Sequence, residues 1–350
     1  MKTHNLLAAI VLATTLTACK DDNETKNNLF AIDFDGIKGQ YKPDESVPLG
    51  VVNVEKKQID SVVYYLNDKK VGTAKGAEKL TAALKDTKLG YQTIKALVYY
   101  EGENAETTGQ IEVISGTKAK ILSYEIVNTY PHDVTSYTQG LEFYHDTLVE
   151  GTGQYGKSVL RKNNYKTGEA YKQIAIDGKY FGEGVTVFGD KIYQLTWKEN
   201  TGFIYNAGNL NKIKDFQYFK PIQGWGLTHD DKHLYQSDGS EKIYKLDPET
   251  LKEVSYVNVY AESRKAKELN ELEYVDGKIY ANVYQTNTIV VVDPETGSVL
   301  GMLDMKDLLN KITKSPETDV LNGIAYNPKT KTFFITGKLW DKMFEIRIKE

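Results

Sequence analysis

Cysteine is almost absent from this sequence of 350 residues, which contains only Cys19. A single cysteine cannot form a framework of internal disulfides. Proline is scarce as well, with eight residues, whereas 25 tyrosines and 28 glycines are typical of many short strands joined by glycine turns. The composition therefore favours an all-β protein whose fold does not depend on disulfides.

A basic surface is also missing. The net charge is −4, and acidic and basic residues are mixed along the chain without a basic stripe. Proteins that bind nucleic acid cluster Lys and Arg to neutralise phosphates, so no nucleic-acid partner is expected. The length exceeds that of one ordinary domain and predicts two, and a hydrophobic share of 40% is sufficient for real cores.

Residues 1–19 have the pattern of a lipoprotein export signal. Lys2 supplies a positive end, residues 6–16 are apolar, and the small residues before Cys19 resemble a bacterial lipobox. The alternative is an ordinary secretory signal with an incidental cysteine. We expect Cys19 to be lipidated and to anchor an exported bacterial lipoprotein, on the outer membrane, the cell surface or the periplasmic face, without spanning the bilayer. Residues 20–28 are polar and are expected to be a tether.

Residues 29–116 contain strands of a different kind from the rest of the chain. The four clearest runs, separated by turn residues, are 47–51, 61–66, 94–100 and 111–114. Such runs predict a small immunoglobulin-like β-sandwich. No cluster of His, Cys or paired carboxylates stands out in this segment, so we interpret it as a spacer or docking module.

One position recurs five times in residues 118–350. The five sites are Thr138-Gln139-Gly140-Leu141, Gly182-Glu183-Gly184-Val185, Gly224-Trp225-Gly226-Leu227, Leu269-Asn270-Glu271-Leu272 and Leu321-Asn322-Gly323-Ile324. Successive sites lie 44, 42, 45 and 52 residues apart (139 to 183, 183 to 225, 225 to 270, 270 to 322). A period near 40–45 residues with short strands in each unit is typical of a β-propeller. The sequence therefore predicts a five-bladed β-propeller whose recurring residues form a ring at the central channel.

The fifth repeat ends after three strands, one fewer than the other four. The apolar run at residues 121–127, just before the first repeat, is the expected donor of the missing strand. Such a pairing closes the ring and removes an exposed sheet edge.

Glu183 is the only carboxylate among the five recurring positions. Phe181, Trp197 and Trp225 are expected to desolvate it partly, and this raises a carboxylate pKa towards the range used in acid–base catalysis. A glutamate that binds channel water is the alternative. We expect all three tryptophans, including Trp340, to lie near the same mouth, and Lys338 to supply a cation there.

Metal chemistry is disfavoured by these residues. A calcium-dependent propeller hydrolase needs several carboxylates around the axis, and a helical zinc motif is not formed by His229 and His233, which lie in a loop. No Gly-x-Ser-x-Gly motif is present. We therefore expect no metal and no cofactor.

Motifs in all five repeats resemble the plant and bacterial glutaminyl cyclase family. They include Tyr137-Thr138-Gln139-Gly140-Leu141, Glu150-Gly151-Thr152-Gly153, Phe181-Gly182-Glu183-Gly184, Leu195-Thr196-Trp197, Gly224-Trp225-Gly226-Leu227-Thr228, Leu269-Asn270-Glu271-Leu272, Asn322-Gly323-Ile324-Ala325 and Thr336-Gly337-Lys338-Leu339-Trp340. The resemblance implies a five-bladed propeller that converts N-terminal glutamine into pyroglutamate with loss of ammonia. It covers residues 120–350 and leaves the N-terminal segment unexplained.

The resemblance also implies roles for single residues. Glu183 matches the acid–base carboxylate, and we expect Lys338 to act with it as a catalytic residue. The residues assigned to substrate binding are Gln139, Tyr137, Phe181, Trp197, Trp225, Asn270, Tyr284, Glu150 and Asn322. Tyr137 stands where the family more often has Phe, and Tyr284 where a Trp is usual, so one wall of the site is altered.

These observations predict a lipid-anchored glutaminyl cyclase. Its substrates would be peptides or proteins with N-terminal glutamine. We expect it to contact the membrane only through the lipid and to be a monomer. The alternative from another class is a non-catalytic surface propeller that binds peptides or glycans. A metal-dependent hydrolase resembling lactonases is disfavoured by the composition of the ring.

Overall fold

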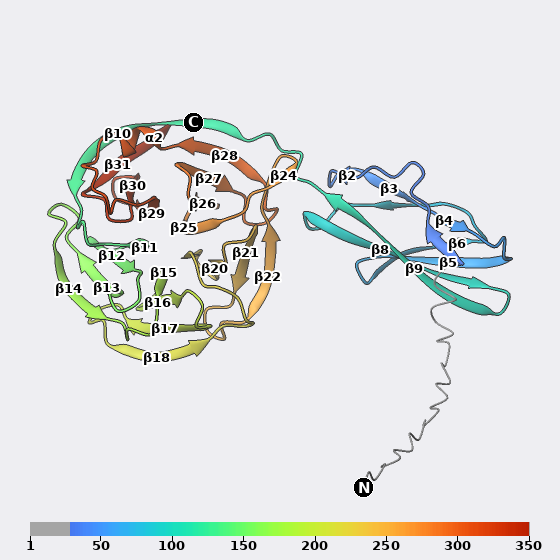
Figure 1. Ribbon diagram of the computed structural model, residues 1–350, viewed down its shortest axis with the longest axis horizontal. Coiled ribbons are helices and arrows are strands. Elements are labelled where there is room, and N and C mark those ends of the chain that lie inside the picture. Colours follow the sequence, from blue (N-terminus) through green and yellow to red (C-terminus); the bar gives the residue numbers. More distant parts are fainter. Residues whose placement is uncertain (1–28, 350) are drawn as a thin grey trace, which may run out of the picture. The chain divides into compact units, whose positions relative to one another are not determined.

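The computed structural model describes residues 29–349, which are built almost wholly from β-strands (Figure 1). Within this range the single helix is α2 (Lys306–Leu309), and no helix has the length and apolar character needed to cross a membrane. The chain separates into two compact units. The first contains residues 29–38, 46–83 and 92–111, and the second contains residues 39–45, 84–91 and 112–349. The export signal, Cys19 and the tether lie outside the described residues.

The N-terminal strands form one five-stranded and two two-stranded sheets. Their bounds are β1 (Phe30–Ile32), β2 (Gln40–Tyr41), β3 (Ser46–Leu49), β4 (Val51–Asn53), β5 (Ile59–Leu66), β6 (Lys69–Lys75), β7 (Leu80–Ala83), β8 (Gly90–Tyr100) and β9 (Glu103–Val113). The larger sheet has the order β2-β9-β8-β5-β6, and the pairs β1-β4 and β3-β7 are the smaller ones. Residues of β8 alternate between buried and more exposed positions, so one face of the sheet supplies a core.

Five groups of four strands, called sheets below, follow and are arranged around a common centre (Figure 1); the first three are separate, and the last two are joined into one eight-stranded sheet. The first three are β11 (Thr138–Tyr144), β12 (Thr147–Thr152), β13 (Val159–Asn163) and β14 (Ala170–Ala175); β15 (Gly182–Phe188), β16 (Lys191–Thr196), β17 (Thr201–Asn206) and β18 (Lys212–Gln217); and β19 (Leu227–His229), β20 (Leu234–Ser237), β21 (Lys242–Leu246) and β22 (Glu253–Asn258). After the hairpin of β23 (Tyr260–Ala261) and β24 (Arg264–Lys265), the fourth sheet contains β25 (Leu269–Val275), β26 (Lys278–Val283), β27 (Thr288–Val292) and β28 (Val299–Asp304). The fifth contains β29 (Leu321–Asn327), β30 (Thr332–Gly337), β31 (Lys342–Lys349) and β10 (Lys120–Pro131). The prediction of an all-β, propeller-like fold is confirmed.

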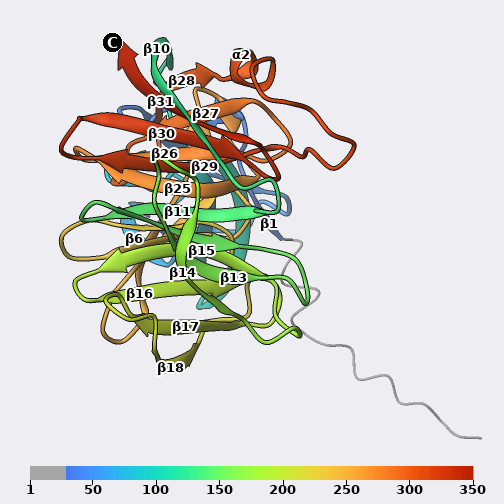
Figure 2. The ribbon, with the colours of Figure 1, turned by 90° about the vertical axis from the view of Figure 1, so that its left-hand side faces the viewer.

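The strand β10 closes the ring. It pairs antiparallel with β31 from Ser123 opposite Lys349 to Pro131 opposite Lys342. Both views place β10 beside β31 and β28 (Figures 1 and 2). The predicted donor strand is therefore confirmed, and it is longer than expected. Its first residues also pair in parallel with β28, so β10 joins the fourth and fifth sheets.

The recurring glycine is explained by the close approach of neighbouring first strands. A Cβ atom added to Gly184 would lie 2.5 Å from the carbonyl oxygen of Trp225 in the next sheet, which is closer than real Cβ contacts. In the fourth sheet the glycine is replaced by Glu271, whose buried carboxyl accepts hydrogen bonds from the backbone N–H groups of Leu141 (3.2 Å) and Ile324 (2.8 Å). Burial raises the pKa of Glu271 well above its usual value. This one departure from the repeat ties three sheets together at the channel.

Apolar side chains fill the space between adjacent sheets. Between the first and second sheets, for example, Val149 and Leu160 pack with Val187, Ile192 and Phe203. Such close-packed contacts hold neighbouring sheets in fixed positions. The ends of their strands can therefore carry a site of defined geometry.

Candidate active site

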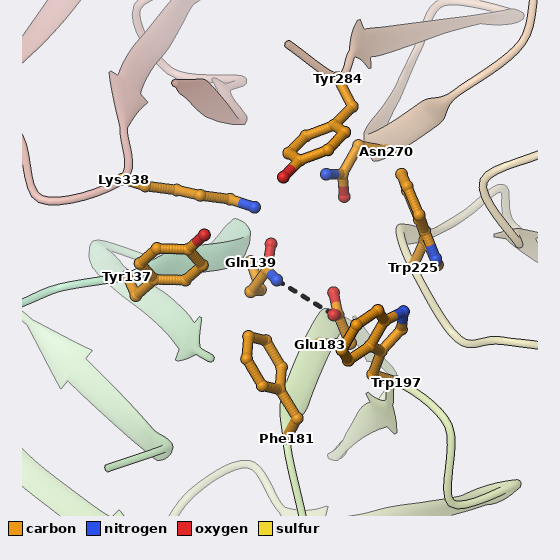
Figure 3. Close-up of a pocket in the computed structure, with 9 residues that line it drawn as sticks. All are labelled: Tyr137, Gln139, Phe181, Glu183, Trp197, Trp225, Asn270, Tyr284 and Lys338. Atoms are coloured by element: carbon orange, nitrogen blue, oxygen red, sulfur yellow. Dashed lines mark hydrogen bonds between the residues drawn. The ribbon is translucent and has the colours of Figure 1, made fainter. Parts of the chain in front are cut away.

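A cavity of about 210 Å³ lies at the end of the ring where first strands begin and second strands end. Nine predicted site residues come together around it, and Figure 3 shows them. They are Tyr137, Gln139, Phe181, Glu183, Trp197, Trp225, Asn270, Tyr284 and Lys338. Each of the five sheets contributes at least one of them, so the cavity depends on closure of the ring.

A bulge in the first strand directs the central side chains. The pairing register shifts between Thr138 and Gly140, between Gly182 and Val185, and between Leu269 and Leu272. A bulged residue leaves the hydrogen-bond ladder and its side chain is re-aimed, which is why bulges are common beside active sites. Gln139, Glu183 and Asn270 lie at these shifts and therefore project into the cavity rather than into a sheet interface.

Glu183 is the only carboxylate among the described residues that line the cavity. The residue is 4% exposed, and its Oε1 accepts a hydrogen bond of 3.0 Å from Nε2 of Gln139. Burial raises the pKa of Glu183 well above its usual value, the positive charge of Lys338 lowers it, and Glu199 adds a smaller increase. A carboxyl group whose pKa is raised in this way is better suited to take up and return a proton during catalysis.

Gln139 is held in one orientation by Asn322. The Asn322 amide donates to Gln139 Oε1 (3.0 Å) and to the backbone oxygen of Thr138 (2.9 Å). Because the Gln139 oxygen is occupied by this donor, its NH₂ group faces Glu183. Asn322 was predicted to bind substrate, but it does not line the cavity. Asn322 lies behind Gln139 as seen from the cavity, and it orients the Gln139 side chain.

Lys338 follows β30 and is 2% exposed. Its Nζ lies 4.7 Å from the ring centre of Tyr137 and 5.0 Å from that of Tyr284. Burial lowers the pKa of Lys338, while Glu183 and Asp319 oppose this shift. The Tyr137 hydroxyl donates to Oδ2 of Asp319 (2.8 Å). Asp319 thus fixes a wall of the cavity, a role that sequence reasoning missed because 182 residues separate the two partners.

Aromatic rings form most of the cavity wall. Phe181 lies 6.1 Å from Tyr137 and 5.6 Å from Trp197 between ring centres. On the other side, Trp225 contacts Tyr284 edge-on, with ring centres 5.5 Å apart and an angle of 85° between the planes. Tyr284, which stands where the resembling family has Trp, therefore still serves as a wall residue.

Glu150 lies outside the cavity, contrary to the prediction that it binds substrate. Its fully buried carboxylate accepts hydrogen bonds from Thr138 (2.7 Å), Asn163 (2.7 Å) and Arg161 Nε (2.9 Å), and it also contacts His132. The charges of Arg161 and His132 outweigh burial and hold the pKa of Glu150 far below its usual range. All its acceptor sites have protein partners, so its role is to hold the start of β11 in place.

Trp340 does not reach the cavity either, so the expectation that all three tryptophans share one mouth is wrong. Its ring is fully buried beside Phe344, and its indole N–H donates to the backbone oxygen of Asp319 (2.9 Å). Trp340 packs in the apolar core of the fifth sheet.

Asn270 has an amide oxygen that is left available for a ligand. It is 3% exposed, it points into the cavity in Figure 3, and its Oδ1 has no protein hydrogen-bond partner. A buried amide without a partner is costly unless a ligand or water satisfies it. Across residues 29–349, no group of three or more His, Cys, Asp or Glu side chains is arranged to hold a metal ion.

Comparisons with known proteins agree with this geometry. Residues 95–348 match the family described as glutamine cyclotransferase. A glutaminyl-peptide cyclotransferase of Arabidopsis thaliana is 41% identical over 234 residues, which span 66% of this chain and 73% of that protein. The crystal structure of Myxococcus xanthus glutaminyl cyclase is similar with a TM-score of 0.62 and 31% identity, covering 66% of this chain and 99% of the other.

The fold and the cavity thus define an enzyme built on a propeller-like ring of sheets. The chain belongs to the glutamine cyclotransferase family. It is an enzyme, a glutaminyl-peptide cyclotransferase, as its sequence motifs predicted.

Proposed function

We propose that the cavity binds the N-terminal glutamine of a peptide or protein and that Glu183 is the acid–base catalyst of its cyclisation. The α-nitrogen forms a bond to the side-chain carbonyl carbon, the bond from that carbon to the amide nitrogen breaks, and ammonia leaves. The observation that carries this assignment is the single buried carboxyl group, Glu183, among aromatic and amide side chains. The names of the relatives support the choice of substrate.

One proton must move during this reaction. The neutral α-amine loses a proton when it attacks, and the departing nitrogen needs one to leave as ammonia. The pKa of a free α-amine is about 7.7–8.0, so a useful fraction is already neutral near pH 8. Glu183 as carboxylate accepts the amine proton and then donates it to the leaving group. Because both reacting groups belong to one residue, holding the side chain folded back supplies much of the rate.

Two groups are placed to stabilise the negative charge that develops on the carbonyl oxygen. Lys338 offers a buried ammonium group, and Asn270 offers an amide N–H. Donors fixed in a water-poor site are worth far more than in solution. The Gln139 amide is already engaged with Glu183 and Asn322, so we assign it to orienting the base.

Replacing Lys338 by Met should move the acid limb of the pH–kcat profile to higher pH. The Lys338 charge lowers the pKa of Glu183 against the effect of burial, so its removal raises that pKa and less carboxylate is present at a given pH. The profile is measured by ammonia release from one Gln-initiated peptide, so the substrate amine titrates identically in every variant. Lys198→Met, which removes a cation outside the cavity, is the control. An unchanged acid limb in Lys338→Met would contradict the electrostatic effect of Lys338 on Glu183.

We also propose that the chain is an exported bacterial lipoprotein that is anchored through Cys19. The support is the sequence of residues 1–19 alone. Expression with a labelled fatty acid should label the wild-type protein, and Cys19→Ser should abolish both the label and retention in the membrane fraction. An equally labelled Cys19→Ser protein would contradict the proposal.

We propose, finally, that the ring is a five-bladed β-propeller acting as a monomer and that residues 29–116 form an immunoglobulin-like sandwich. The five groups of four strands, the last two joined through β10, and the separate N-terminal sheets support this description. All nine cavity residues come from one chain, so no second copy is needed. Light scattering of the purified protein tests the monomer, and an experimental structure tests the sandwich. A dimer mass would contradict the monomer. N-terminal sheets that do not pack face to face would contradict the sandwich.

A further inference from the structure

Two walls of the cavity share one hydrogen-bond acceptor. The indole N–H of Trp197 (2.6 Å) and that of Trp225 (2.9 Å) both donate to Oε1 of Gln223. Trp197 follows β16, and Trp225 precedes β19, so this oxygen links side chains of two adjacent sheets. Both indole nitrogens lie on the side of their rings away from Gln139 (Figure 3). The part of each ring that is left to face the cavity is therefore hydrocarbon.

Other contacts support the rings from outside the cavity. The Trp225 ring packs on Gly239, where an added Cβ would lie 2.5 Å from the ring atom Cε2. Nζ of Lys198 lies 3.6 Å from the ring centre of Trp197, and neither Lys198 nor Gly239 lines the cavity. One face of each indole is thus covered. The hydrogen bond from each indole N–H to Gln223 then restricts the rotation that remains about the side-chain bonds of each tryptophan.

The path of the loop that precedes β19 and contains Gln223 does not depend on the Gln223 side chain. The backbone N–H of Gly224 donates to the Trp197 carbonyl (3.0 Å), and that of Trp225 donates to the Ser237 carbonyl (3.2 Å). Gln223 itself is exposed at the rim and does not line the cavity. Water can replace its oxygen at such a place, so loss of the carboxamide should cost the fold little while releasing both rings.

We propose that Gln223 is a positioning residue that sets the orientation of Trp197 and Trp225 and thereby the fit of the substrate. The two rings present apolar surface to the methylene groups of the bound glutamine, which are its only apolar part. The kinetic consequence rests on the proposed function, whereas the effect on the indoles does not. Sequence reasoning missed Gln223, although it stands only two residues before Trp225.

The test is Gln223→Met, which keeps the size of the side chain and removes the acceptor. We expect KM for a Gln-initiated peptide to rise by about three- to tenfold, which is the change in affinity that corresponds to the free energy of about one hydrogen bond. We expect kcat to stay within about twofold of the wild-type value. The near-ultraviolet circular dichroism of the indoles should weaken while Tm stays unchanged. Gln223→Glu, which keeps an acceptor oxygen, should retain the wild-type dichroism.

Gln217→Met is the matched control, because Gln217 lies on the outer strand β18, outside the cavity lining, and its amide donates to Thr201 of β17. It should leave KM and the dichroism unchanged. An unchanged KM in an otherwise active Gln223→Met enzyme would overturn the inference, as would a KM rise accompanied by a fall in Tm or a loss of dichroism in Gln223→Glu. Absence of turnover in the wild type would instead refute the proposed function, and the dichroism would then decide the inference alone.

Discussion

Glu183→Gln is expected to lower kcat for a Gln-initiated peptide by about 10²- to 10⁴-fold, the range that a positioned general acid–base group contributes. Gln has the same shape, and its oxygen can still accept the hydrogen bond from Gln139, so the cavity keeps its geometry. What is lost is the group that moves the proton from the α-amine to the leaving nitrogen. Because binding is expected to persist, KM should change much less than kcat.

The control for this variant is Glu199→Gln. Glu199 lies outside the cavity lining and contributes only a small increase to the pKa of Glu183. Its replacement should leave kcat near the wild-type value and move the acid limb slightly to lower pH. Turnover by Glu183→Gln within a few-fold of wild type would remove Glu183 from the mechanism.

Deletion of residues 1–130 is expected to abolish activity and cooperative unfolding, whereas deletion of residues 1–116 should leave a folded, active enzyme. The longer deletion removes all of β10 but Pro131, and with it the partner of both β31 and β28. The fifth sheet would then have a long unpaired edge, and the ring would be open between its last two sheets. Since Asn270 of the fourth sheet and Lys338 of the fifth lie on opposite sides of this seam, the cavity would lose its shape as well.

The shorter deletion keeps β10 whole. Its Tm is expected to be lower than that of the full chain, because residues 39–45 and 84–91 belong to the same compact unit as the ring. Ammonia release and thermal unfolding of the two truncated proteins are the measurements. Full activity and an unchanged Tm in the protein that begins at residue 131 would show that β10 does not close the ring.

The repeat could be found in the sequence because physical contact imposes it. At Gly140, Gly184 and Gly226 the chain passes too close to its neighbour for a Cβ atom, and a bulge at the first two of these places directs the preceding side chain into the cavity. A local rule repeated at a fixed period is visible without a structure. This is why Gln139, Glu183, Trp225 and Asn270 could be named from their positions in the repeats, whereas a residue such as Tyr284 was assigned through the resemblance to a family.

Side-chain direction and distant partners could not be predicted in the same way. Glu150 stands in a motif next to cavity residues, but in β12 its side chain points to Arg161 and Asn163 on the neighbouring strand. The hydrogen bond from Tyr137 to Asp319 joins residues far apart in the chain. In the N-terminal unit, the run 47–51 was expected to be one strand, but it is divided at Gly50 into β3 and β4, which pair with different partners.

Cyclisation of N-terminal glutamine in this cavity, with Glu183 as the catalytic acid–base group, can be measured directly. Purified residues 29–350 are incubated with a Gln-initiated peptide, ammonia is followed by a coupled assay, and the peptide is followed by mass spectrometry. We expect equal molar amounts of ammonia and pyroglutamyl peptide from the wild type, and loss of both with Glu183→Gln. A wild-type protein that releases no ammonia above the uncatalysed rate, or a Glu183→Gln variant that matches it, would contradict the account.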